Sequence, residues 1–440
     1  MRVGTLAFVI GILVMVVGLG VSIALHEIGH LYPAKKFGVR VGQYMIGFGP
    51  TLWSRRIGET EYGVKLLPLG GYISMAGMYP PSPKQGSAGS GFFRTMVQDA
   101  RAANDETLDG EDDARVFYRL PVYKRIIVML GGPIMNLLFA IVLFAILFSG
   151  IGVATASTTV SAVSECMLPA GTTQTECTAS DPATPAAQAG FQPGDTILEI
   201  DGQPVATFAE ASALIQAAPG RNLDILIRRD GAERMLVLTP VLAERPVYDD
   251  RNQEVLDADG QVVTQSVGFA GIRPTSELMR QPIWAGPEAA IENVGAVVGI
   301  VVQLPVKLYD TAVALFTGAE RDPDGPLSIV GVGVIGGEIA SADAPILSRI
   351  AGMLGLVASV NIALFVFNLV PLLPLDGGHV VVALWDGIRR GWVKLFRRPP
   401  PPPVDATRLV PVTFVVVVLL VAMGAILILA DLFNPIDLLP

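Results

Sequence analysis

The chain alternates between long uncharged apolar runs and polar stretches. Four runs are long enough to cross a bilayer, whose hydrocarbon core of about 30 Å requires about 20 helical residues. They cover residues 4–25, 126–148, 351–375 and 409–430. A shorter run at 294–306 contains a proline, so we expect it to lie at the membrane interface or to pack on the helical bundle. The pattern predicts a polytopic α-helical membrane protein with four transmembrane helices.

The positions of Lys and Arg predict the side of the membrane on which each loop lies. Basic residues follow the first run, precede the second, and gather again between the third and fourth, whereas none follows the fourth. We therefore expect the loops at 34–125 and 381–408 to be cytoplasmic. Both termini and the region between the second and third runs should be extracytoplasmic. The first run has no small-residue cleavage site, which favours a retained span over a signal peptide.

Composition agrees with a membrane protein and argues against one class of partner. Hydrophobic residues make up 51% of the chain and charged residues only 16%. The net charge of −9 supplies no cationic field that would hold phosphates. Nucleic acid is therefore not expected as a partner.

The loops between the apolar runs differ in character. In the first cytoplasmic loop, residues 62–76 are apolar and β-prone but are broken by one proline and two glycines, which favours a hairpin of short strands. Residues 80–115 are rich in Pro, Ser, Gly and acidic residues and are expected to form a flexible surface insertion. Residues 276–349 should form an interfacial connection. Five prolines at 399–403 predict a stiff spacer before the fourth run.

Residues 151–275, between the second and third runs, are typical of a soluble α/β domain. A short helix, a turn and a strand are predicted over 186–202, a second helix follows, and the Asp-Gly turn at 230–231 joins two strands of a hairpin. This order resembles that of a single PDZ domain. Cys166 and Cys177 lie in what reads as an insertion near its first strand. On the extracytoplasmic side a disulfide between them is favoured over two unpaired thiols.

Candidate chemistry begins with the HExxH motif of residues 26–30, at the end of the first apolar run. Positions i and i+4 share one face of a helix, so His26 and His30 can bind one zinc ion, and Glu27 is placed to take a proton from water. Ionisable groups at a membrane span are costly and are usually functional. This context favours a metal site over a polar helix end that happens to carry two histidines.

A catalytic zinc ion needs a third protein ligand and one open position. Two candidates stand at the end of the third run, Asp376 and His379. Asp376 offers a hard oxygen donor on a glycine-flanked bend, whereas His379 could instead support a ligand or begin a helix. Spacing alone leaves both open.

The combination of motifs resembles the site-2 protease family of intramembrane zinc metalloproteases, in the bacterial branch that cleaves anti-sigma factors. It comprises HExxH in the first run, a PDZ-like domain after the second, and Asn-x-x-Pro-x-x-Pro-Leu-Asp-Gly at 368–377 in the third. Residues 131–136 and 325–326 also fit the family pattern. The likeness covers nearly the whole chain, although some members have two PDZ domains where this sequence shows one.

The resemblance implies roles for individual residues. It implies one Zn²⁺ per chain, held by His26, His30 and Asp376, with Glu27 as general base. Asn136 is expected to support helix packing. In the family the β-prone stretch dips into the membrane and adds a strand to unwound substrate, as β-augmentation would allow. The residues expected to bind or support substrate are Asn368, Pro371, Pro374, Gly377, Leu66, Gly70, Gly71 and Tyr72.

These observations predict an intramembrane zinc metalloendopeptidase of a bacterial cell membrane that hydrolyses peptide bonds in or near transmembrane segments. Expected partners are single-span membrane proteins, such as an anti-sigma factor after a first cut or signal-peptide remnants, then peptide C-termini or segments at the PDZ-like domain, and membrane lipid. A membrane scaffold without catalysis and a zinc transporter are the rival functions. The complete set of catalytic residues argues against the first, and the lack of an obvious inverted repeat argues against the second.

Overall fold

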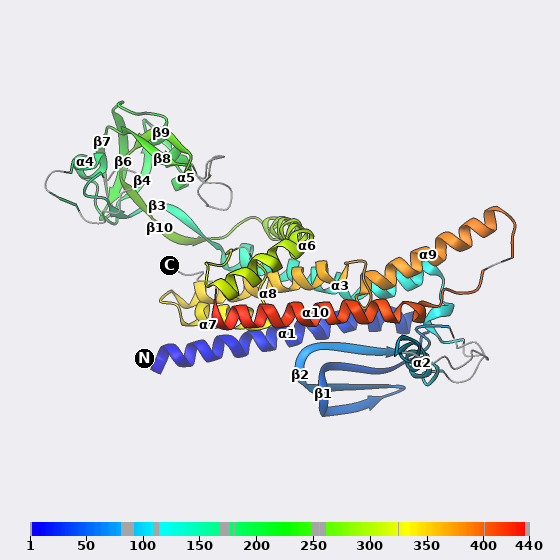
Figure 1. Cartoon of the computed structure of the whole chain (residues 1–440). Coiled ribbons are helices and arrows are strands. Elements are labelled where there is room, and N and C mark those ends of the chain that lie inside the picture. The colour runs from blue at the N-terminus through cyan, green and yellow to red at the C-terminus, as the bar shows by residue number, and fades with distance from the viewer. Residues whose placement is uncertain are drawn as a thin grey trace. The chain divides into compact units, whose positions relative to one another are not determined.

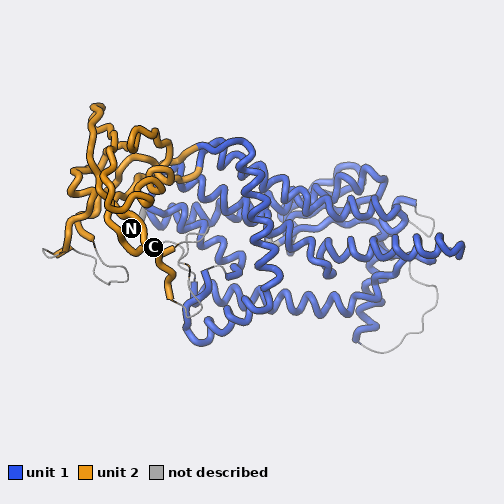
Figure 2. The backbone as a smooth tube through the Cα atoms, turned by 90° about the horizontal axis from the view of Figure 1, so that it is seen from above, with its two compact units in different colours: residues 1–152, 280–440 blue, residues 153–279 orange. Residues whose placement is uncertain are grey.

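The computed structural model describes residues 2–80, 92–108, 114–167, 177–178, 181–247, 255, 261–323, 325–399 and 401–435. The chain divides into two compact units (Figure 2). The first consists of Met1–Gly152 together with Arg280–Pro440, and the second is Val153–Met279.

The first unit is built around long apolar helices (Figure 1). They are α1 (Arg2–Lys36), α3 (Val122–Ala145, continued by the π-helical turn η2, Ile146–Ile151), α6 (Ala285–Thr317), α7 (Ile329–Ser341), α8 (Ile346–Asn368), α9 (Asp376–Leu395) and α10 (Val410–Phe433). α3 packs against both α1 and α8. Buried apolar side chains from α3 and α8, among them Phe144 and Ile362, form the core between these helices. Hydrophobic residues elsewhere on these helices are exposed, as expected for surfaces that face lipid.

A pair of glycines brings α1 and α3 into close contact. A Cβ atom added at Gly29 would lie 2.2 Å from the carbonyl oxygen of Gly131, and one added at Gly131 would lie 2.0 Å from that of Gly29. Only small residues let two membrane helices approach this closely. The crossing point lies next to His30, so this contact helps to position the HExxH motif against α3.

The helix count differs from the four spans expected. Residues 294–306 belong to α6, whose 33 residues continue through Pro305 and through the polar residues on either side of the apolar run. Five of the described helices therefore have the length and composition of a membrane span: α1, α3, α6, α8 and α10. The apolar run at 294–306 is shorter than α6 because the backbone stays helical on both sides of the run, where polar side chains interrupt the hydrophobic pattern.

A curved sheet follows α1. It consists of β1 (Val41–Ile57) and β2 (Thr60–Met75), joined at Gly58, whose φ of 65° suits a tight turn. Both strands bend, so that Met45 of β1 pairs with Gly63 and also with Tyr72 of β2. Residues 61–64 run parallel to 43–46, whereas residues 71–74 run antiparallel to the same residues, so the chain reverses within the stretch 62–76 as expected. The two arms flank residues 43–46 of β1 instead of pairing with each other.

Part of the stretch expected to be a flexible insertion is helical. Residues Phe92–Asp105 form α2, in which Asn104 is buried and donates a hydrogen bond to the carbonyl oxygen of Tyr79. Arg101 of α2 forms an ion pair with Asp405 at 2.6 Å, just before the short helix η3 (Ala406–Leu409). These polar contacts hold a segment whose composition alone suggested disorder. Residues 81–91 and 109–113 of the same stretch lie outside the described residues; η1 (Phe117–Arg119) completes this region.

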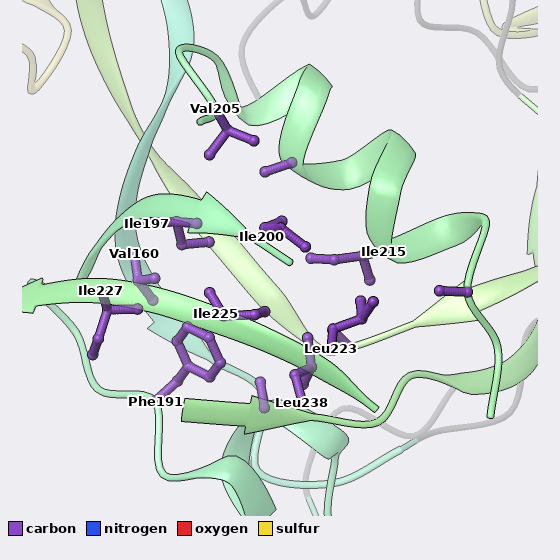
Figure 3. Packing of buried hydrophobic residues seen from close by; sticks show 14 residues of the cluster. Val160, Phe191, Ile197, Ile200, Val205, Ile215, Leu223, Ile225, Ile227 and Leu238 are labelled. Atoms are coloured by element: carbon purple, nitrogen blue, oxygen red, sulfur yellow. The ribbon is translucent and has the colours of Figure 1, made fainter. Parts of the chain in front are cut away.

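The second unit is a small α/β domain around an antiparallel sheet in the order β10-β3-β4-β6-β7, with β5 paired to β4 and a separate pair β8-β9. The elements are β3 (Val153–Val163), α4 (Pro185–Ala189), β4 (Thr196–Ile200), β5 (Gln203–Pro204), α5 (Phe208–Gln216), β6 (Leu223–Arg229), β7 (Ala232–Leu238), β8 (Val241–Pro246), β9 (Thr264–Phe269) and β10 (Ile272–Met279). Alternate residues of β6, such as Ile225 and Ile227, meet Phe191 in its core, together with Ile197 and Ile200 of β4 (Figure 3). Cys166 and Cys177 form a disulfide.

Candidate metal centre

Two imidazoles and a carboxylate converge where α1 meets the start of α9. His26 and His30 lie one turn apart on α1, and their Nε2 atoms are 3.1 Å apart. Asp376 is the first residue of α9, and its Oδ2 lies 3.3 Å from the Nε2 atom of each histidine. Among the described residues, these three form the cluster whose ligand atoms all lie within 4.8 Å of one another.

The donor set suits a zinc ion. The Oδ2 atom of Asp376 is buried and has no hydrogen-bond partner in the described structure, which is costly for a carboxylate oxygen unless a cation binds it. Two imidazole nitrogens and one carboxylate oxygen are ligands that catalytic zinc sites use, and three protein ligands leave one coordination position open. The residues present therefore fit the metal that the HExxH motif suggests.

Each histidine is oriented by a hydrogen bond at its other ring nitrogen. Nδ1 of His26 donates to the side-chain oxygen of Asn136 at 2.6 Å, and Nδ1 of His30 donates to the carbonyl oxygen of Val128 at 2.8 Å. Both acceptors are on α3. Because these oxygens accept, both Nδ1 atoms carry the proton, and both Nε2 atoms are left with a lone pair for a metal.

Asn136 is itself held by a buried polar network that the sequence analysis missed. Its Nδ2 donates to Oδ1 of Asn361 on α8 at 2.9 Å, and Nδ2 of Asn361 donates to Oγ of Ser22 on α1 at 2.8 Å. All three side chains have an exposed fraction of 0%. The signal that could have revealed it is an amide inside an apolar run, because a polar side chain there needs a partner.

A cavity of about 380 Å³ opens beside the three ligand residues. Glu27, next to His26 in the motif, lines this cavity and is 7% exposed. The bent part of β2 and the end of α8 also line the cavity. The residues proposed earlier for substrate that line the cavity are Gly70, Gly71, Tyr72, Asn368 and Pro374.

Three of the residues expected to bind or support substrate do not line this cavity. Leu66 is 53% exposed on β2, and Pro371 is exposed on the turn between α8 and α9. Gly377 is buried, and a Cβ atom there would lie 2.4 Å from the carbonyl oxygen of Leu369. Gly377 therefore permits the tight bend that brings Asp376 back towards α1. His379 lines the cavity but is not part of the three-residue cluster.

The arrangement defines a class of protein: a metalloprotease whose HExxH helix lies in a bundle of apolar helices. The chain matches Peptidase family M50 over residues 14–397 and belongs to this family. It is 31% identical to the zinc metalloprotease Rip1 of Mycobacterium tuberculosis over 445 residues, which cover 98% of this chain and 99% of the relative. The Rip1 protein of Mycolicibacterium smegmatis is also 31% identical, with the same coverage. The metalloprotease MmpA of Caulobacter vibrioides is 28% identical over 87% of this chain and 88% of its own length.

These findings identify the protein as an intramembrane zinc metalloprotease, as the sequence motifs predicted. It is a multi-pass membrane protein, it uses Zn²⁺ as its cofactor, and membrane proteins are its substrates.

Proposed function

We propose that His26, His30 and Asp376 hold the catalytic zinc ion and that Glu27 is the general base. The observation that carries this proposal is the convergence of the three ligand atoms within 4.8 Å at the wall of the cavity that Glu27 also lines. A zinc ion held there would supply Lewis acidity to the scissile carbonyl and to water. The carboxylate of Glu27 takes a proton from the water whose oxygen bonds to the carbonyl carbon, and it gives that proton to the amide nitrogen as the C–N bond breaks. Asn368, which lines the same cavity, is proposed to bind a peptide group of the substrate.

The bent strand β2 is proposed to hold the substrate in extended form. Residues 71–74 of β2 pair on one side with residues 43–46 of β1. The other side of residues 43–46 pairs with residues 61–64 of β2. Residues 71–74 thus form an edge of this sheet, and Gly71, Tyr72 and Ile73 line the cavity. An edge strand can pair with an added strand through main-chain hydrogen bonds. A transmembrane helix hides its amides in internal hydrogen bonds, so pairing along β2 would hold an unwound segment beside the metal.

A paired measurement tests the catalytic assignment. The full chain and its Glu27→Gln variant are purified, and the zinc content and cleavage of a single-span membrane substrate are measured for both. We expect about one zinc ion per chain in each, and a loss of cleavage in the variant of at least about 100-fold. Glu233→Gln, at an exposed position of the second unit, is the matched control. Full cleavage by Glu27→Gln would reject Glu27 as the base.

We also propose a topology with both termini and the second unit outside the cytoplasm. The distribution of Lys and Arg supports it, and a disulfide in the second unit suits an oxidising compartment. α6 fits as an interfacial helix, because its start packs on Ala145 at the end of α3, and Asn434 at the end of α10 donates to Ala314 near the end of α6. The ends of α3 and α10 are both outside in this topology. Membrane-impermeant labelling of single cysteines placed in the second unit and in residues 381–399 would distinguish the two sides.

The second unit is proposed to be a PDZ domain that binds peptide C-termini or extended segments of substrates. Its order of strands and helices, with a capping box at Thr207 and Glu210 starting α5, supports this assignment. The natural substrates are proposed to be single-span proteins already cut on the outer side, either anti-sigma factors or signal-peptide remnants. Incubation with matched substrates that keep or lack an outer domain tests this: faster cleavage of the trimmed form is expected, and equal rates would contradict a need for the first cut.

A further inference from the structure

The far half of α9 projects beyond the helical bundle. Its first half is tied to α3, because the buried carboxylate of Asp386 accepts a hydrogen bond from Arg125, and Gly387 lies against Val122 at the start of α3. Residues after Gly387 therefore extend past the first residue of α3. Figure 1 shows this end of α9 reaching beyond the neighbouring helices of the first unit.

One face of α9 carries an exposed apolar stripe. Its members recur every three or four residues along the helix and its C-cap, and their exposed fractions range from 46% to 73%. They are Val381, Leu384, Trp385, Ile388, Trp392, Leu395 and Phe396. Residues between them on the opposite face, Ala383 and Asp386, are buried. The stripe therefore faces away from the bundle, and its last members, Leu395 and Phe396, remain more than half exposed among the described residues.

Basic residues accompany the projecting end. Arg389, Lys394, Arg397 and Arg398 lie within or just after it, and none of these four forms an ion pair with a described residue. The segment 387–398 contains no acidic residue, and Arg390 is paired with Asp386. The projecting end is therefore both apolar along one face and strongly cationic.

We propose that the projecting end of α9 docks in the headgroup layer of an anionic membrane leaflet. The stripe begins at Val381, where α9 still packs on α3, and continues along one face to Phe396. Other helices of the bundle also expose apolar side chains, which suit lipid, so lipid is the occupant that the continuity of this surface favours. Tryptophan favours the interface between hydrocarbon and water. Basic side chains beside an apolar helix face bind anionic headgroups. The docking surface consists of the apolar stripe and the four unpaired cations.

Docking at this surface bears on the metal centre through the helix itself. α9 is one continuous helix from Asp376 to Leu395, so restraining its projecting end also restrains the direction of the residue that provides the carboxylate. The docking itself does not depend on the proposed catalytic roles.

The native tryptophan at position 392 provides the probe. The full chain carrying Trp53→Phe, Trp284→Phe and Trp385→Phe keeps Trp392 as its fluorophore. It is reconstituted in vesicles of brominated phosphatidylcholine, with or without phosphatidylglycerol, and quenching of its emission is measured. We expect quenching by the brominated chains, stronger in the anionic vesicles and weakened by salt.

A charge-reversal variant isolates the cationic contribution. In the same background, Lys394→Glu, Arg397→Glu and Arg398→Glu are combined, and Arg221→Glu, Arg228→Glu and Arg234→Glu in the second unit serve as the matched control. Each cation near an anionic surface changes the docking equilibrium by about fivefold, so the first variant should lose the extra quenching and the control should keep it. Emission from Trp392 that is unquenched in both vesicles would overturn the proposal. So would a Trp392→Cys variant that cross-links between two copies, because a second copy would then cover the stripe.

Discussion

Asn136 on α3 accepts a hydrogen bond from Nδ1 of His26 on α1 at a distance of 2.6 Å. Through its amide nitrogen, the same side chain reaches Asn361 on α8. A single buried amide therefore links three helices and at the same time sets which nitrogen of His26 faces the metal site. Packing of the bundle and preparation of the metal ligand are parts of one network.

Removing the amide of Asn136 should weaken zinc binding more than it weakens folding. Asn136→Leu leaves Nδ1 of His26 without its acceptor, and loss of such a partner typically costs about 10- to 100-fold in metal affinity. Competition with a chromogenic chelator measures this affinity in the purified protein. Asn293→Ala is the control, because Asn293 bonds Ser359 between α6 and α8 without touching the metal centre. Equal zinc affinities in wild type and Asn136→Leu would show that the bond does not prepare the ligand.

The two candidate third ligands should respond differently to substitution. Loss of a hydrogen-bond partner of a metal ligand lowers metal affinity by about 10- to 100-fold. Asp376→Asn removes an anionic ligand itself, so it is expected to lower zinc affinity by more than that. His379→Asn alters a residue that lines the cavity outside the three-residue cluster and should keep about one zinc ion per chain. Zinc content after dialysis, measured by atomic absorption, compares them. Loss of zinc from His379→Asn alone would make His379 the third ligand.

The contact between Gly29 and Gly131 should not tolerate a methyl group. Gly29→Ala would place its Cβ atom 2.2 Å from a backbone oxygen of α3, so the two helices must separate. Overpacking of this kind costs about 1–3 kcal/mol. Thermal unfolding in detergent should show a lower midpoint for this variant. Gly20→Ala is the control on the same helix, since a Cβ atom at Gly20 has no neighbour within 4 Å; a similar drop in both variants would point to a general effect of the substitution.

The second unit should lose stability in acid through one buried ion pair. Burial favours a raised pKa for Asp195, but two hydrogen bonds from Arg229, at 2.6 and 2.7 Å, together with one from the backbone N–H of Gln192, lower the pKa of Asp195 below its usual value. In the unfolded chain this carboxyl takes up a proton near pH 4. Below about pH 4 the unfolded state therefore binds more protons than the folded state. The ion pair contributes its full stability above that pH, and this contribution is lost as the pH falls towards the lower pKa of Asp195 in the folded state.

Hydrogen exchange of the β4 and β6 amides in the full chain measures this effect. Protection should fall in wild type as the pH drops below about 4, once the intrinsic dependence of exchange on pH is removed. Asp195→Asn should start from lower protection and lose less of it over this range. Parallel curves for the two proteins would exclude Asp195 as the source of the acid sensitivity.

The parts of the site that follow local periodicity were predictable from the sequence. His26 and His30 share a face because a helix repeats every 3.6 residues, and no distant contact is needed to know it. The long apolar runs likewise predicted α1, α3, α8 and α10, because a membrane span needs an unbroken stretch of apolar residues. For α6 the hydrophobic pattern predicted only residues 294–306, because the apolar run ends before the helical hydrogen bonds do. In β2, the proline and glycines at 68–71 mark a reversal of the chain, as their composition indicated, but the spacing did not show that β1 would lie between the two arms.

Contacts between distant segments could not be read from spacing. Asp376 and His379 were equal candidates in sequence, and the tight backbone contact at Gly377 is what turns the carboxylate of Asp376 towards α1. Asn361 showed only as a polar residue within an apolar run, until α1, α3 and α8 packed around it. A helix face is set by neighbours three or four residues away, whereas a metal site needs atoms from segments about 350 residues apart; folding of the bundle alone brings them within bonding distance.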